Sequence, residues 1–80
     1  MPTLIRQPLQ MGNIIRSRRK ELGWTQEVLA EKTGLRQATI SQIETGSHAT
    51  RIGTILKVIA VLDLDLLARP RQRRPIEEIL

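Results

Sequence analysis

The sequence contains no cysteine, so disulfide bonds and thiolate metal sites are excluded. Trp24 is the only aromatic residue, which argues against a base-stacking platform for single-stranded nucleic acid. No hydrophobic run approaches the roughly 20 residues that span a bilayer. The N-terminal stretch MPTLIRQPLQ has no apolar core followed by a cleavage site, as a signal peptide would have. These absences predict a cytoplasmic protein that no membrane-spanning segment anchors to a membrane.

Catalytic groups are also scarce. The chain has one histidine, His48, and no glycine-rich phosphate loop. Asp63 and Asp65 alternate along an extended stretch, and Glu77 and Glu78 are adjacent near the end, so neither pair forms an evident acid–base pair. We therefore expect no enzyme activity, no cofactor and no metal.

Positive charge predominates, with 13 Lys and Arg residues against 8 Asp and Glu residues and a pI near 11.1. This balance favours a polyanionic partner, which leaves duplex DNA, RNA and an anionic membrane surface open. The 80 residues make one domain with a modest core, so we expect additional stabilisation from dimerisation or from another source.

Four helices are predicted. The first runs over residues 8–22, the second follows a cap at Thr25 and ends near residue 33, and the third runs over residues 37–45. A glycine follows each of these three helices, as expected for C-terminal caps. Thr50 is expected to cap the fourth. Its predicted core face is the helically spaced set Ile52, Ile55, Leu56 and Ile59.

The stretch LDLDL at residues 62–66 has the alternation of a half-buried strand. A lone strand leaves its backbone groups unpaired, so we expect it to pair with the same segment of a second chain. The alternative is pairing with the N-terminal arm at residues 3–6. The fourth helix also carries surplus apolar residues. The expected dimer interface comprises Val58, Val61, Leu64 and Leu66. This organisation gives an arm at 1–7, a domain at 8–68 and a tail at 69–80.

The second and third helices are joined by a tight turn containing Gly34, the arrangement of a helix-turn-helix. The outward positions of the third helix are neutral hydrogen-bonding groups or small apolar groups. A glutamine amide donates and accepts together, which matches the edge of adenine, and a small methyl group fits the thymine methyl. The alternative is an ordinary solvated surface, but the turn favours base reading.

The stretch TQEVLAEKTGLRQATISQIETG, residues 25–46, resembles the helix-turn-helix of the Xre/lambda-repressor-like family. The similarity covers about residues 8–68. Within that family, GWTQ, RQATIS and the leucine strand are similar to antitoxins of the HipB type. The resemblance implies a mainly α domain of four helices with a short C-terminal β-strand that pairs across a homodimer. It also implies a repressor of its own operon that sequesters a HipA-like kinase toxin.

The resemblance also assigns residues. Base-reading positions are Gln37, Ala38, Gln42 and, as an additional reader, Ser41; phosphate-contacting positions are Gln26, Arg36 and Thr39. Arg36 replaces the Ser or Thr that caps the third helix in many members. Glu44 is implied to be a structural acid, paired with Arg18 or Arg19.

The expected function is a sequence-specific repressor that binds a palindromic operator duplex. Two versions are open: an antitoxin with a kinase toxin partner, or a stand-alone repressor. An apolar tail end, with Ile76, Ile79 and Leu80, suits docking on a toxin. A third possible function is that of a basic RNA-binding or scaffolding module.

Overall fold

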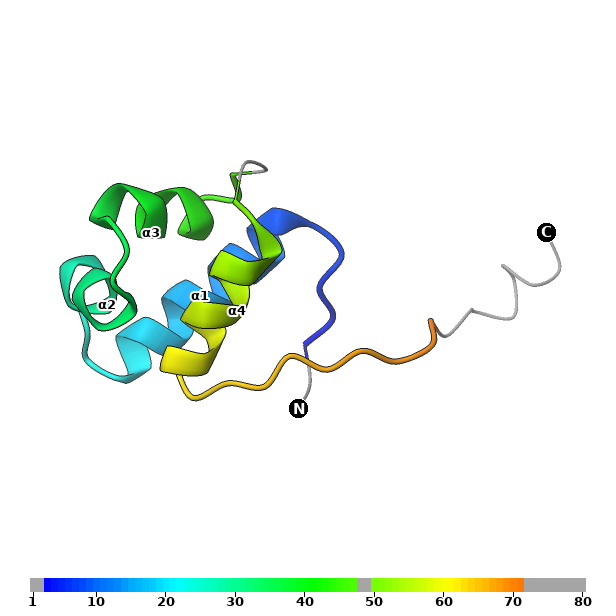
Figure 1. The fold of residues 1–80 in the computed structure, drawn as a ribbon. Helices are drawn as coiled ribbons and strands as arrows, with labels where there is room; N and C mark the ends of the chain where they lie inside the picture. The colour runs from blue at the N-terminus through cyan, green and yellow to red at the C-terminus, as the bar shows by residue number, and fades with distance from the viewer. Residues whose placement is uncertain (1–2, 48–49, 72–80) are drawn as a thin grey trace, which may run out of the picture.

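The computed structural model describes residues 3–47 and 50–71. It contains the helices α1 (Pro8–Glu21), α2 (Gln26–Thr33), α3 (Gln37–Glu44) and α4 (Ile52–Val61) in that order. Helix α3 packs against α1 and α2, and α2 also packs against α4 (Figure 1). The four predicted helices are therefore confirmed, with α1 and α3 each one residue shorter than expected.

The helix ends follow local chemistry. Pro8 opens α1, where its missing N–H costs no hydrogen bond. The Thr25 hydroxyl accepts a hydrogen bond from the Val28 N–H at 3.1 Å and caps α2. The predicted cap at Thr50 is wrong: α4 begins at Ile52 with Arg51 as its N-cap, and the Arg51 side chain makes no capping hydrogen bond.

The core lies between the helices and is apolar. Its buried members are Met11, Ile15, Leu29, Ala30, Ile40, Ile43, Val58, Ile59 and Leu62. Three polar residues, Arg19, Thr33 and Glu44, are buried with it. No buried side-chain nitrogen or oxygen in the described part of the chain lacks a hydrogen-bond partner. Each polar group inside the core is therefore compensated.

Gly12 lies where α1 crosses the end of α3. A Cβ atom at this position would lie 2.4 Å from the carbonyl oxygen of Ile43 and 2.6 Å from that of Glu44. Only a residue without a side chain lets the two backbones approach so closely. The sequence pattern alone does not indicate this role for Gly12.

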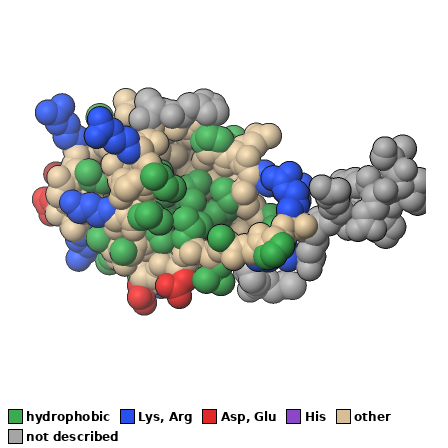
Figure 2. Space-filling view, turned by 45° about the vertical axis from the view of Figure 1, so that its right-hand side comes forward, with side chains coloured by type: hydrophobic (Ala, Val, Ile, Leu, Met, Phe, Trp, Pro, Cys, Tyr) green, Lys and Arg blue, Asp and Glu red, His purple; other side chains and the backbone are tan. Residues whose placement is uncertain are grey.

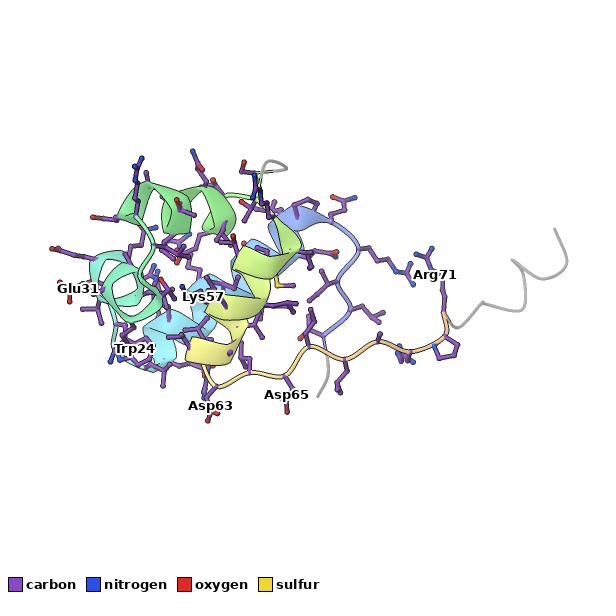
Figure 3. All side chains as sticks on the ribbon, in the orientation of Figure 1. Trp24, Glu31, Lys57, Asp63, Asp65 and Arg71 are labelled. Atoms are coloured by element: carbon purple, nitrogen blue, oxygen red, sulfur yellow. The ribbon has the colours of Figure 1, made fainter. Side chains whose placement is uncertain are left out.

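Of the predicted strand at residues 62–66, the first two residues form the turn that ends α4, and the rest is an extended segment that has no ladder partner among the described residues. Residues 64–71 form no strand, and they exchange no backbone hydrogen bond with residues 3–6, so the described monomer does not contain the pairing with the arm. The alternation holds only in part: Leu64 packs against the core and Asp63 and Asp65 point away from the helices (Figure 3), but Leu66 is exposed. Asp63 has a left-handed φ of 57°, which turns the chain out of α4.

Candidate nucleic-acid interface

The turn between α2 and α3 is held by backbone hydrogen bonds and one apolar side chain. Gly34 adopts a φ of 72° and its N–H bonds to the Glu31 carbonyl at 3.3 Å. The Leu35 N–H bonds to the Ala30 carbonyl at 3.0 Å, and the Leu35 side chain packs against the core. The turn therefore fixes α3 relative to α2 as one unit.

Helix α3 has one buried face and one polar face. Ile40 and Ile43 are buried, and Glu44 joins them at the end of the helix. The side chains predicted to read bases occupy positions i, i+1, i+4 and i+5, which share one side of a helix. They are Gln37, Ala38 and Gln42, which are exposed, and Ser41, which is half-buried. The structure thus gathers all four on an accessible surface that carries no charge.

The predicted phosphate-contacting residues lie at the start of α2, at the N-cap of α3 and within α3. Arg36 is exposed at the N-cap of α3, and its side chain makes no capping hydrogen bond. Thr39 is half-buried on α3. Gln26, the first residue of α2, is half-buried, and its side-chain nitrogen donates to the Glu44 carboxylate at 3.2 Å. The bond between Gln26 and Glu44 was not predicted.

A buried ion pair ties α1 to the end of α3. Arg19 donates from Nε to Glu44 Oε2 at 2.7 Å and from Nη2 to Oε1 at 3.0 Å. Its Nη1 donates to the Trp24 carbonyl at 2.8 Å. Arg18 instead pairs with Glu21 at 3.2 Å on the surface. The choice that the sequence left open between Arg18 and Arg19 is resolved in favour of Arg19.

The electrostatics of this pair favour the charged guanidinium. The hydrogen bonds that the Glu44 carboxylate accepts raise the pKa of Arg19 above its ordinary value, burial opposes the change, and the charge of Glu44 adds to it. Both side chains are almost inaccessible, so neither is free to contact another molecule directly. Their effect on the surface is exerted through Gln26 and the placement of α3.

The dimer residues need one correction. Val58 is fully buried in the core of the monomer and has no surface to offer a second subunit. Val61 and Leu64 are half-buried against that core, and Leu66 is exposed. The face of α4 that packs inside carries Ile55, Val58, Ile59 and Leu62, again with helical spacing.

This orientation of α4 leaves other apolar side chains exposed to solvent. Ile52 is 66% exposed and Leu56 is 46% exposed, although both were predicted to be core residues, and Leu67 is 81% exposed. Figure 2 shows hydrophobic side chains gathered near the centre of one face, with Lys and Arg side chains toward its edges. The sequence does contain one indication of this exposure: α4 is apolar on more than one side, so its apolar side chains cannot all face the same core. Ile76, Ile79 and Leu80 lie outside the described residues.

Two negative findings concern only residues 3–47 and 50–71. No group of three or more His, Cys, Asp or Glu residues lies close enough to hold a metal ion. None of the four helices is both long enough and apolar enough to cross a membrane. The polar face of α3 and the apolar surface of α4 are therefore the features on which a functional interpretation depends.

Comparison with known proteins places these features in context. The Helix-turn-helix family matches residues 15–68. Antitoxin HipB of Escherichia coli strain K12 is 39% identical over 59 residues, which cover 74% of this chain and 67% of HipB. Two solved structures, a HipB-O4 20mer complex and a HipA-HipB-O2-O3 complex, each match with a TM-score of 0.80 and 34% identity. In both, the match covers 89% of this chain and 100% of the other chain.

Proposed function

This chain belongs to the helix-turn-helix family, and on that premise we propose that it is a DNA-binding transcriptional repressor that also serves as an antitoxin. In this role it binds a palindromic operator as a homodimer and a HipA-like kinase as its toxin partner. The similarity to HipB, and to HipB solved with a 20mer and with HipA, supports both parts. The proposed role is regulatory, without catalysis or a cofactor, and belongs in the cytoplasm with the operator.

The observation that carries the proposal is the uncharged polar face of α3. A helix with this face fits the major groove, where hydrogen-bond donors and acceptors distinguish base pairs. Gln37, with Ala38, Gln42 and Ser41 beside it, would read base edges. Charged side chains at these positions would favour phosphates over bases, so the neutral character of the exposed surface supports sequence reading.

Phosphate contacts would hold α3 in register. Arg36 lies at the start of α3 with an exposed guanidinium, Gln26 lies at the start of α2, and Thr39 is on α3 itself. Contacts to phosphate supply affinity and orientation without reading sequence. The excess of positive charge on the chain supports the same division of labour.

The dimer in this proposal uses the extended segment after α4. Leu66 and Leu67 are exposed on a backbone that has no ladder partner within the described part of the chain, and pairing with the same segment of a second copy would satisfy that backbone. Val61 and Leu64 extend the apolar contact, and Leu56 supplies exposed surface on α4. The dimer would place two α3 helices in successive major grooves about 34 Å apart. In this organisation residues 8–68 form the binding and dimerisation domain, between an arm at 1–7 and a tail at 69–80.

The toxin contact is assigned to the tail. Its apolar residues, Ile76, Ile79 and Leu80, suit a docking segment because a repressor without a protein partner gains little from apolar residues that follow its DNA-binding domain. Replacing all three by serine should abolish co-purification with a co-expressed HipA-like kinase and leave operator affinity unchanged. Retained co-purification would contradict this assignment. An absence of any kinase partner would favour the stand-alone repressor.

The test of DNA reading begins with selection of preferred duplexes from random sequence at fixed salt. Gln37→Ala should lower affinity for the selected duplex by about 1–3 kcal/mol and relax base preference at one position of each half-site. Arg36→Ala is the matched contrast, because it should weaken binding to selected and scrambled duplexes alike. It should also make the slope of log affinity against log salt concentration shallower by about one, the value for one lost phosphate contact. Equal losses on both duplexes for Gln37→Ala would refute base reading. Equal affinity of the wild-type protein for RNA and DNA would favour the RNA-binding module.

A further inference from the structure

The buried carboxylate of Glu44 joins three helices at one point. It is the last residue of α3 and is 5% exposed. Oε1 and Oε2 accept hydrogen bonds from Arg19 of α1, and Oε1 also accepts one from Gln26 of α2. The end of the recognition helix and the start of α2 therefore share one acceptor group.

This acceptor determines how the Gln26 amide lies. A carboxylate only accepts hydrogen bonds, so Gln26 must turn its nitrogen toward Glu44, and its oxygen lies on the other side of the amide. Reversing the amide would place the oxygen of Gln26 against a negative charge. One N–H of the amide is used by Glu44, and the other remains for a further acceptor on a side chain that is still partly exposed.

Arg19 makes this arrangement compatible with DNA. An unpaired carboxylate near the DNA backbone would repel the phosphates. The bidentate contact with Arg19 compensates the negative charge of Glu44. The Trp24 carbonyl accepts a third bond from the same guanidinium and fixes its plane. A glutamine that is already oriented loses less side-chain freedom when it binds a phosphate than a free one does.

We infer that Arg19 and Glu44 are positioning residues for an operator phosphate contact made by the remaining amide N–H of Gln26. The inference rests on the proposed DNA binding and adds a role that neither buried residue can perform by direct contact. It also predicts that the phosphate anchor at α2 and the placement of α3 are energetically coupled, because both depend on one carboxylate.

The experiment is a methylphosphonate scan of the selected duplex, in which one phosphate at a time is made neutral. For the wild-type protein, neutralising the phosphate that Gln26 contacts should lower affinity by about tenfold. Gln26→Ala should bind the natural duplex more weakly and lose this sensitivity. Glu44→Gln introduces an amide that also donates, so the orientation of Gln26 is no longer enforced and the sensitivity at the same linkage should largely disappear. Glu21→Gln, which removes an exposed acid of α1, is the matched control and should retain it.

Folding is monitored by circular dichroism and thermal unfolding for each variant. Arg19→Lys keeps the charge but loses the two-pronged contact, so it provides a second, milder test if Glu44→Gln does not fold. Unchanged sensitivity in the folded variants overturns the inference, as does a loss spread equally over all linkages, which would indicate a purely structural role. Sensitivity that survives Gln26→Ala also overturns it. Failure of the wild-type protein to prefer any duplex would instead refute the proposed function.

Discussion

Replacing Gly12 by alanine tests the close backbone contact between α1 and the end of α3. The added Cβ would lie under 3.0 Å from three backbone atoms at the end of α3, the nearest at 2.4 Å. Backbone atoms cannot rotate away as a flexible side chain can. The helices α1 and α3 would have to separate by about 1 Å to restore ordinary contact.

The magnitude is a balance between two effects. Alanine is preferred over glycine inside a helix by about 1 kcal/mol, which favours the variant. Overpacking a core costs about 1–3 kcal/mol and sometimes more, and a clash with backbone belongs at the upper end. We expect a net loss of about 2 kcal/mol, which corresponds to a fall in Tm of about 10 °C for a domain of this size.

The assay is urea unfolding at one fixed protein concentration, because association changes apparent stability. Gly53→Ala is the matched control, since a Cβ at Gly53 in α4 meets nothing within 4 Å. The control should be more stable than the wild-type protein by about 0.5–1 kcal/mol. If Gly12→Ala were as stable as Gly53→Ala, the close approach of α1 to α3 would be disproved.

Three further outcomes are expected. Glu44→Ala should destabilise the fold by about 3–5 kcal/mol in urea unfolding, because the buried Arg19 guanidinium loses its partner; a loss below about 1 kcal/mol would contradict this. The pKa of Arg19 is raised in the folded protein. Arg19 therefore contributes its full stabilisation below the ordinary arginine pKa, and this contribution is lost only as pH rises through the higher pKa of the folded state. The difference in unfolding free energy between wild type and Arg19→Met should therefore stay constant from about pH 7 to 10, and a steady rise with pH, which a lowered folded pKa would produce, would refute the sign of the shift. Thr25→Ala should cost about 1 kcal/mol by removing the acceptor for the Val28 N–H, whereas Thr45→Ala on the surface should change stability by less than about 0.5 kcal/mol; equal effects would argue against the cap.

Helix existence could be predicted from the sequence because the signals are local. Each i to i+4 hydrogen bond lies within one turn, and the glycines that stop α1 and α2 adopt the positive φ their positions require. Thr25 caps α2 for the same local reason. The cap of α4 was misplaced because Thr50 and Arg51 are adjacent, and a shift of one residue is a small change in local energy.

The inward face of α4 could not be chosen from its pattern. The helix is apolar on more than one side, so Ile52 to Ile59 and Ile55 to Leu62 both satisfy helical spacing. The contact of α4 with α2 selects the second set and leaves Ile52 and Leu56 exposed. The partner of the leucine segment is equally non-local, since a strand ladder depends on a second segment that the sequence of the first does not specify.

The sequence by itself determined the kind of surface that α3 presents, because side chains 3.6 residues per turn apart share a face whatever the helix packs against. Only the tertiary structure decided that Arg19, rather than Arg18, meets Glu44, that Gln26 shares this carboxylate, and that Gly12 must have no side chain. Neighbouring positions on a helix point about 100° apart, and the one that faces a partner 25 residues away depends on how three helices pack together.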